Sequence, residues 1–209
     1  MSELIDALER LMLEHGRIGS QVPNFLLPGL DPETIRERIA TLDIEPVAEV
    51  IDLFSWHNGT DNDRYVSSGA GIGYGRLFED VFFGTLDEAI EYYGECLQID
   101  RNVMEMYEEA ERTWPLSWFP PFSGGLPTYG IECDLASPTR GLVFEPWWHP
   151  PIEEPIRPRF RSLTHLVRSV VRRFEAGGYW WDSTIGFLRT RDEVLEPLFK
   201  QERLEASRS

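Results

Sequence analysis

The chain has 209 residues, of which 42% are hydrophobic and 12% aromatic, a composition typical of one generous globular domain and not of a disordered chain. Its formal net charge is −16, with 24 acidic and 7 basic residues in positions 1–111, and such a charge excludes sequence-independent binding to nucleic acid. No stretch approaches the roughly 18 apolar residues of a membrane span, and the acidic N-terminus is unlike a signal peptide, so we expect a cytoplasmic protein.

Three amphipathic helices are predicted before the first glycine-rich stretch. Apolar residues at helical spacing predict a first helix that Gly16 closes. A second helix begins with Asp31 as its N-cap and Pro32 in its first turn. The third helix, Glu45–Gly59, reads EPVAEVIDLFSWHNG and carries one apolar stripe, with Pro46 in its first turn. The sequence therefore predicts a helical N-terminal block.

The end of the third helix is sharply marked. Asn58 and Gly59 both tolerate the left-handed conformation that ends a helix, and His57 sits where a cation favours the C-terminal dipole. Residues 58–76 are rich in Gly, Ser, Asp and Asn and are predicted to be mostly loop. The glycines at 69–75 precede a strand, and no Gly-Lys-Ser/Thr follows them, so they do not predict a phosphate-binding loop.

A short strand and two helices come next. Val81–Phe83 reads as a buried strand, and Thr85 and Glu88 form a capping box that opens the first of the two helices. A separate and very acidic helix, RNVMEMYEEAER, is predicted after Asp100. Its glutamates crowd one another at helical spacing, which is typical of a solvated face, with an interface as the alternative.

A block of strands follows. Residues 114–122, WPLSWFPPF, are aromatic and proline-rich and are predicted to be an extended edge segment. The alternation over Tyr129–Leu135 is the clearest strand pattern in the chain, and Leu142–Phe144 is predicted to complete a hairpin with it. The proline-rich stretch 147–158 is predicted to be a loop and carries two adjacent tryptophans.

The last part of the chain returns to helices. One amphipathic helix begins after Ser162 and leaves Arg168, Arg172 and Arg173 outside its apolar stripe. YWWD then predicts a short strand, and residues 190–209 a final helix. Helices first, then a meander of strands with helices between and after, predict a single α+β domain with a central antiparallel or mixed sheet flanked by helices.

Several of these stretches, taken in order, resemble the SUKH superfamily. They are LPGLDPETI, the helix ending in WHNG, and SWFPPFSGGLPTYGIECDL, and the resemblance covers about Leu27 to Gly178. The branch that it resembles contains fungal cell-wall-assembly regulators and bacterial toxin-immunity proteins. The resemblance implies an α+β domain at 27–182, with helical extensions at 1–26 and 183–209.

The densest polar cluster consists of His57, Asn58, Asp61 and Asp63. One hypothesis is a hydrolase in which His57 is the general base and an aspartate orients it, although a helix exit followed by a turn explains the same residues. The two aspartates lack the further ligands of a calcium loop, and no histidine has a second His or Cys at metal-ligand spacing. The two cysteines read as small buried hydrophobes. We therefore predict no metal, no cofactor and no enzyme.

The negative charge favours a module that binds another protein, and so does the number of tryptophans, which is larger than the edge of a small sheet commonly buries. An acidic surface would steer a basic partner, whereas plain solubility is the alternative use of the charge. Exposed tryptophans would anchor such an interface, unless they seal the open face of the sheet. The residues predicted to form this surface are Asp61, Asp63, Glu79, Asp80, Glu105, Glu108, Trp118, Trp147 and Trp148.

The SUKH resemblance implies a sharper function, an immunity protein that binds and neutralises a toxin domain, which is expected to be basic. A regulatory scaffold of the cell-wall-assembly type is the alternative among binding proteins, and a hydrolase at His57 with Asp61 or Asp63 is the alternative of another class. The arginines between Arg157 and Arg173 are interspersed with prolines and core residues, so we predict that they pair internally with the acidic half and do not bind nucleic acid.

Overall fold

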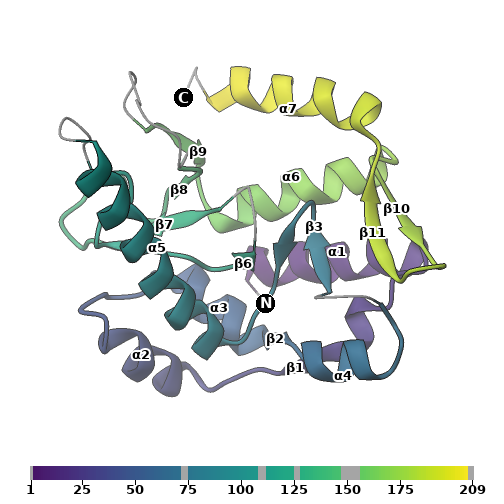
Figure 1. Ribbon diagram of the computed structural model, residues 1–209, viewed down its shortest axis with the longest axis horizontal. Helices are drawn as coiled ribbons and strands as arrows, with labels where there is room; N and C mark the ends of the chain where they lie inside the picture. The colour runs from purple at the N-terminus through teal and green to yellow at the C-terminus, as the bar shows by residue number, and fades with distance from the viewer. Residues whose placement is uncertain (1, 72–74, 108–111, 125–127, 147–155, 207–209) are drawn as a thin grey trace.

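The computed structural model describes residues 2–71, 75–107, 112–124, 128–146 and 156–206, with side chains described as far as Glu202. Helices and small sheets are interspersed, and the α+β prediction is confirmed (Figure 1). The described helices are α1 Glu3–Arg17, η1 Val22–Phe25 (a short 3-10 helix), α2 Pro32–Ala40, α3 Ala48–Trp56, α4 Asn62–Ser67, α5 Leu86–Met106, α6 Leu163–Glu175 and α7 Asp192–Ala206.

All described strand pairs are antiparallel. This agrees with the first of the two predicted sheet types, antiparallel or mixed. The strands are β1 Leu26–Pro28, β2 His57–Thr60, β3 Arg76–Phe78, β4 Val81–Phe82, β5 Trp118–Phe119, β6 Ser123–Gly124, β7 Gly130–Glu132, β8 Val143–Phe144, β9 Pro158–Phe160, β10 Tyr179–Asp182 and β11 Phe187–Thr190. In the described part of the chain they form a four-stranded sheet in the order β5-β7-β8-β9, a three-stranded sheet β3-β4-β6, and the pairs β1-β2 and β10-β11. The strands are therefore spread over several small sheets.

One hydrophobic core joins these sheets to the helices. α1 packs along α6, and Figure 1 shows the two helices side by side. Leu8 of α1, Phe54 of α3 and Val170 of α6 are fully buried in this core, and Leu195 of α7 belongs to it as well. Burying a side chain of this kind contributes roughly 1.5–3 kcal/mol. Both the first and the last helix of the chain are thus held by the same core as the middle.

The first two helices match the prediction. In α2 the Asp31 carboxylate accepts hydrogen bonds from the backbone N–H groups of Glu33 and Thr34, at 3.1 and 3.0 Å, so it caps the helix as expected. No helix among the described residues is long and apolar enough to cross a bilayer.

The third helix is shorter than predicted at both ends. Val47 is the N-cap of α3, so Pro46 precedes the helix, and His57 leaves it in extended conformation to pair with Pro28 in the β1-β2 ladder. Strand pairing is possible here because the chain directly after β1 passes tightly against the end of α3: a Cβ atom at Gly29 would lie 1.9 Å from the Ser55 carbonyl oxygen. The helix therefore ends at His57, and the predicted end at Asn58 and Gly59 is wrong, because these two residues belong to β2.

The segment 58–76, predicted to be mostly loop, contains more structure than its composition indicates. Asp61 accepts a hydrogen bond from the Arg64 N–H at 2.9 Å and begins α4, and β3 starts at Arg76. Polar residues form this one-and-a-half-turn helix because Asp61 caps it and because Tyr65 is buried against Phe25.

α5 confirms the capping box but not the predicted break. The Thr85 hydroxyl accepts from Glu88 N–H, the Glu88 carboxylate accepts from Thr85 N–H, and the helix then runs unbroken to Met106. Asp100 does not end it, because its carboxylate faces inward and accepts three hydrogen bonds from Thr113 and Trp114. The chain after α5 is thereby tied back to the helix.

Replacing Asp100 by alanine is expected to lower the free energy of unfolding by about 1–3 kcal/mol, because buried donors of Thr113 and Trp114 lose their acceptor. Urea unfolding measures this loss. Glu105→Ala, at an exposed position of the same helix, is the control and should change stability by less than about 0.5 kcal/mol. Equal effects of the two substitutions would contradict this role for Asp100.

The predicted elements of the C-terminal half are largely present. β5 lies at the edge of the four-stranded sheet, and β7 and β8 pair as the predicted hairpin, with Ile131 opposite Val143. Ser162 caps α6 by accepting from His165 N–H at 3.1 Å. The strand β11 was not predicted, since the final helix was expected from residue 190.

Candidate functional site

The His57 cluster is not assembled as a catalytic pair. His57 is half-buried, and its Nδ1 atom donates a hydrogen bond to the Leu27 carbonyl at 2.7 Å. The Asp61 carboxylate is engaged by the Arg64 N–H, and Asp63 is exposed on α4. A general base needs an orienting partner, and here that partner is a backbone carbonyl and not the predicted aspartate. The geometry therefore gives the hydrolase hypothesis no support.

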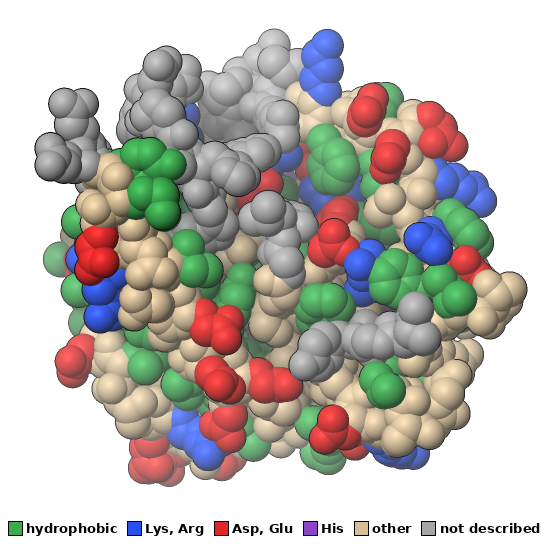
Figure 2. Space-filling view, viewed as in Figure 1, with side chains coloured by type: hydrophobic (Ala, Val, Ile, Leu, Met, Phe, Trp, Pro, Cys, Tyr) green, Lys and Arg blue, Asp and Glu red, His purple; other side chains and the backbone are tan. Residues whose placement is uncertain are grey.

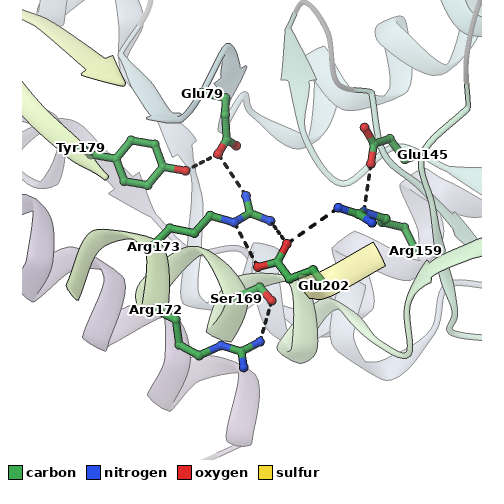
Figure 3. A network of polar contacts seen from close by, with 8 residues as sticks. All are labelled: Glu79, Glu145, Arg159, Ser169, Arg172, Arg173, Tyr179 and Glu202. Atoms are coloured by element: carbon green, nitrogen blue, oxygen red, sulfur yellow. Dashed lines mark hydrogen bonds and ion pairs between the residues drawn. The ribbon is translucent and has the colours of Figure 1, made fainter. Parts of the chain in front are cut away.

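Glu79 lies inside the molecule, in a network of charged side chains shown in Figure 3. The Arg173 guanidinium, with 1% of its side chain exposed, donates to Glu79 at 3.0 Å and to both oxygens of Glu202 at 3.2 and 2.6 Å. The Tyr179 hydroxyl donates to the same Glu79 oxygen. A second arginine, Arg159, forms ion pairs with Glu202 at 3.8 Å and with Glu145 at 3.3 Å. The network joins α6, α7, β9 and β10.

Two predictions are corrected by this network. Glu79 is not part of an accessible acidic surface, because its carboxylate is neutralised by Arg173. Arg173 was expected outside the apolar stripe of its helix, yet it is buried, because carboxylates from two other elements meet its guanidinium. Arg168 and Arg173 pair with Glu3 and Glu79 of the acidic half, as predicted for this run of arginines. The ion pairs of Arg159 are instead with Glu145 and Glu202, which lie outside that half.

The network sets opposed pKa shifts in its members. Burial raises the pKa of the Glu79 carboxyl, and the neighbouring Arg173 guanidinium opposes that rise. Burial disfavours the charge of Arg173, but Glu79 and its other partners outweigh this and hold the arginine pKa well above its ordinary value. Burial, reinforced by Glu79, raises the pKa of the Tyr179 hydroxyl. These groups are internal and structural, since the network bonds most of their polar atoms to one another.

Asp80 is also neutralised within the chain. Its carboxylate lies 2.5 Å from the Arg76 guanidinium, which in turn lies over the Phe187 ring at 3.7 Å from the centroid. Figure 1 shows α4, which carries Asp63, and the C-terminal end of α5, which carries Glu105, on opposite sides of the molecule. The predicted acidic residues are therefore not brought together into one patch.

Trp118 is not an exposed anchor, because only 4% of it is exposed. Its ring stacks on Phe144 with centroids 4.3 Å apart, and its indole N–H donates to Glu132 at 3.3 Å. It seals one end of the four-stranded sheet together with Trp114 and Cys96. Cys96 and Cys133 are both buried and free, as predicted. Glu108, Trp147 and Trp148, which were also predicted for the surface, lie outside the described residues.

The acidic residues that do gather on the surface belong to α5. Its buried side is formed by Leu86, Ala89, Tyr93, Cys96 and Asp100, so the side chains between them point outward. We refer to six exposed residues on that side as the α5 outer face. They are Asp87, Glu91, Glu95, Gln98, Asn102 and Glu105.

The charge of the α5 outer face is only partly neutralised. Arg38 of α2 pairs with Asp87 at 2.7 Å, whereas Glu91, Glu95 and Glu105 have no ion pair within the described ranges. Figure 2 shows acidic side chains gathered at the lower left, over the region where Figure 1 places α2 and the first half of α5. Glu91 and Glu95 were missed from the sequence, although their spacing opposite the apolar stripe was a usable signal.

Large hydrophobic side chains are exposed beside this face. Five of the nine exposed large hydrophobic residues in the described part of the chain fall between positions 99 and 116. We call this group the α5 apolar end, and its members are Ile99, Met104, Met106, Tyr107 and Leu116, with exposures of 39, 38, 71, 44 and 59%. An exposed cluster of this kind marks an interaction site more often than scattered single residues do.

A pocket of about 500 Å³ lies where α6 begins, and its lining mixes charges of both signs, including Glu3, Asp52, Arg161 and Arg168. The helix N-terminus itself is occupied, since the Glu49 carboxylate accepts from the backbone N–H groups of Leu163 and Thr164. Among the described residues no group of three or more His, Cys, Asp or Glu side chains could hold a metal ion.

Comparison with known proteins adds no assignment. No family model matches the chain, and no curated protein matches it. The SUKH resemblance thus rests on the motifs and their order alone.

Proposed function

We propose that this protein is a non-enzymatic binding module that recognises a basic protein partner through the α5 outer face. The single observation that carries the proposal is that, in the part of the chain that the structure describes, some carboxylates form ion pairs within the chain and others do not. Glu79, Asp80 and Asp100 are matched by arginines of the chain itself, whereas Glu91, Glu95 and Glu105 have no ion-pair partner among the described residues.

Charge of this kind acts mainly on the rate and specificity of association. Exposed like charges four residues apart on a helix are mildly destabilising, by about 0.2–0.5 kcal/mol per pair, so Glu91 and Glu95 cost the free protein a little. The same carboxylates attract a basic surface over about 10 Å at moderate ionic strength and accelerate its docking. An acidic face on a protein of net charge −16 fits a partner that binds nucleic acid, because it presents charge as phosphates do.

The SUKH resemblance gives this partner a biological identity within the proposal. An immunity protein binds and blocks a toxin domain, and a basic nuclease domain would meet the α5 outer face with complementary charge. The direct test is co-expression with the C-terminal domain of the protein encoded next to this gene. We expect the wild-type chain to relieve the toxicity of that domain, and full toxicity in the presence of well-folded chain would overturn the immunity function.

Reversing two charges on α5 should slow association with this basic domain. We expect Glu91→Lys combined with Glu95→Lys to lower the association rate constant about tenfold or more at low salt, because the steering field changes sign over the helix. The difference should shrink as salt is added, because screening removes the field. Stopped-flow kinetics at several salt concentrations measure both effects.

The matched control changes net charge equally at a different place. Glu193 and Glu196 are exposed on α7, and Figure 1 shows that helix far from the first half of α5. Glu193→Lys combined with Glu196→Lys should leave most of the association rate intact. If both double variants slow association equally, overall charge governs the encounter and the α5 outer face is not the site.

A further inference from the structure

The α5 apolar end and the α5 outer face adjoin on one helix. Ile99 and Met106 are seven residues apart, which places them two turns apart on one side of α5. Glu95 lies one turn before Ile99 on the same side, and Glu91 one turn before that. Carboxylates and exposed apolar groups therefore follow one another along a single line on the helix surface.

This line rests on a rigid support. Asp100 on the inner side of α5 holds the backbone of Thr113 and Trp114, and the Tyr93 hydroxyl donates to the Leu116 carbonyl at 2.8 Å. The returning chain is thus fixed against the helix, so Leu116 is held beside it. A preorganised surface loses little conformational entropy when a partner binds.

The charge of the helix end indicates the chemistry of that partner. The carbonyl end of a helix carries a partial negative charge, and α5 has no basic residue in its last turn to compensate it. Nearby, Arg112 is already committed to Asp100 at 3.6 Å. The apolar end is therefore bordered by the carboxylates of Glu95 and Glu105 and by a helix terminus whose last turn carries no basic residue.

We propose that the α5 apolar end, with Glu91 and Glu95 beside it, binds a cationic amphipathic helix of the partner protein, with lysine or arginine on the carboxylates and apolar side chains on Ile99 and Met106. This inference rests on the proposed function, since it specifies which segment of a basic partner docks first. Amphipathic helices are recognised by apolar surfaces of this kind through anchors three and four residues apart. Charge complementarity then fixes the direction of the bound helix.

Defined peptides test the inference on the full chain. The probe is a fluorescein-labelled helical peptide of about 18 residues with lysines on one face and leucines on the other. Its counterpart has the same charge with glutamine in place of leucine. Fluorescence anisotropy at about 150 mM salt should give at least about tenfold tighter binding of the leucine peptide to the wild-type chain, because apolar burial survives where exposed charge pairs are screened.

Two double variants locate the binding. Ile99→Ser with Met106→Ser should abolish the preference for the leucine peptide, whereas Leu13→Ser with Leu135→Ser, which removes exposed hydrophobics elsewhere, should retain it. All four positions are exposed, so circular dichroism and thermal unfolding should show folded proteins. No preference for the leucine peptide, or a preference that persists in the first variant, would overturn the inference. A variant that loses the preference yet still binds the basic domain normally leaves the proposed function standing and removes only the assigned docking mode.

Discussion

Replacing Arg173 by alanine should destabilise the protein by about 3–5 kcal/mol, because a buried ion-pair network loses its central cation. The guanidinium is 1% exposed and lies between the carboxylates of Glu79 and Glu202. Without it the two carboxylates lose the cation that lies between them. The variant also loses the contact of the guanidinium with the Phe199 ring of α7, which lies 4.4 Å away.

Urea unfolding of Arg173→Ala and Arg172→Ala compares neighbours on one helix. Arg172 is exposed and donates to Ser169 at 2.9 Å, so its loss should cost less than about 0.5 kcal/mol. Because the cost at Arg173 comes from uncompensated carboxylates, adding Glu79→Gln to Arg173→Ala should restore part of the lost stability. Equal stabilities of the two single variants would show that the buried network does not hold the fold.

Stability should fall on mild acidification because of His15, the second large effect. The ring is fully buried and packs against Phe174, with centroids 4.8 Å apart. Its Nε2 donates to the Leu77 carbonyl at 2.8 Å, and its Nδ1 accepts from the Ser20 hydroxyl at 2.9 Å. The neutral ring satisfies both bonds, whereas a proton on Nδ1 would place an unpaired positive charge in the core. Burial accordingly lowers the pKa of His15 to about 4.

The sign of the effect follows from the two pKa values. The unfolded chain takes up the proton near pH 6.5 and the folded chain only near pH 4, so acid favours the unfolded state between these values. Going from about pH 7 to about pH 5 should therefore remove about 2 kcal/mol of stability through this group. The raised pKa of Glu79 acts in the opposite sense, since that carboxyl binds a proton more readily when folded.

The contribution of His15 is isolated by comparing how the stability of the wild-type chain and of a His15 variant depends on pH. Urea unfolding of the wild-type chain and of His15→Gln at both pH values gives two slopes, and the glutamine variant should lack the fall attributed to His15. Glutamine can donate and accept, so it is a reasonable replacement for both hydrogen bonds. Identical pH dependence in the two proteins would contradict the buried neutral histidine.

Local signals in the sequence predicted the local structure well. Asp31, Thr85 with Glu88, and Ser162 mark helix starts that the structure confirms, because each cap bonds backbone groups within its own turn. The alternation around Ile131 likewise predicted a real strand. Such features depend on neighbours in the chain and not on the rest of the fold.

The failures have a common cause in long-range partners. Arg173 and Asp100 are charged residues at buried helix positions, and their partners, such as Glu79 and Thr113, come from elsewhere in the chain. His57 directly follows α3 and begins the strand β2, because β1 lies beside it and pairs with it. A periodicity rule assigns charged residues to the solvent, so it cannot anticipate charges that are compensated by distant elements.

The candidate site also divides into features that the sequence predicted and features that depend on long-range contacts. The acidic half and a basic partner were predicted from composition, but only some of the residues chosen, such as Asp63 and Glu105, are exposed. Glu79 and Trp118 were selected for their charge and size, and both turned out to be internal. Glu91 and Glu95 follow from the helical period of α5 once its buried side is known. Placing a surface requires knowing which carboxylates the chain has already neutralised.

The most direct test is hydrogen exchange of this chain alone and in complex with the basic partner domain that the proposed function requires. We predict slowed exchange that is centred on α5, residues 86–106, with little change across β2 and α4. Slowed exchange centred on His57–Ser67, with α5 unchanged, would contradict binding through α5 and would favour binding at the polar cluster around the start of α4.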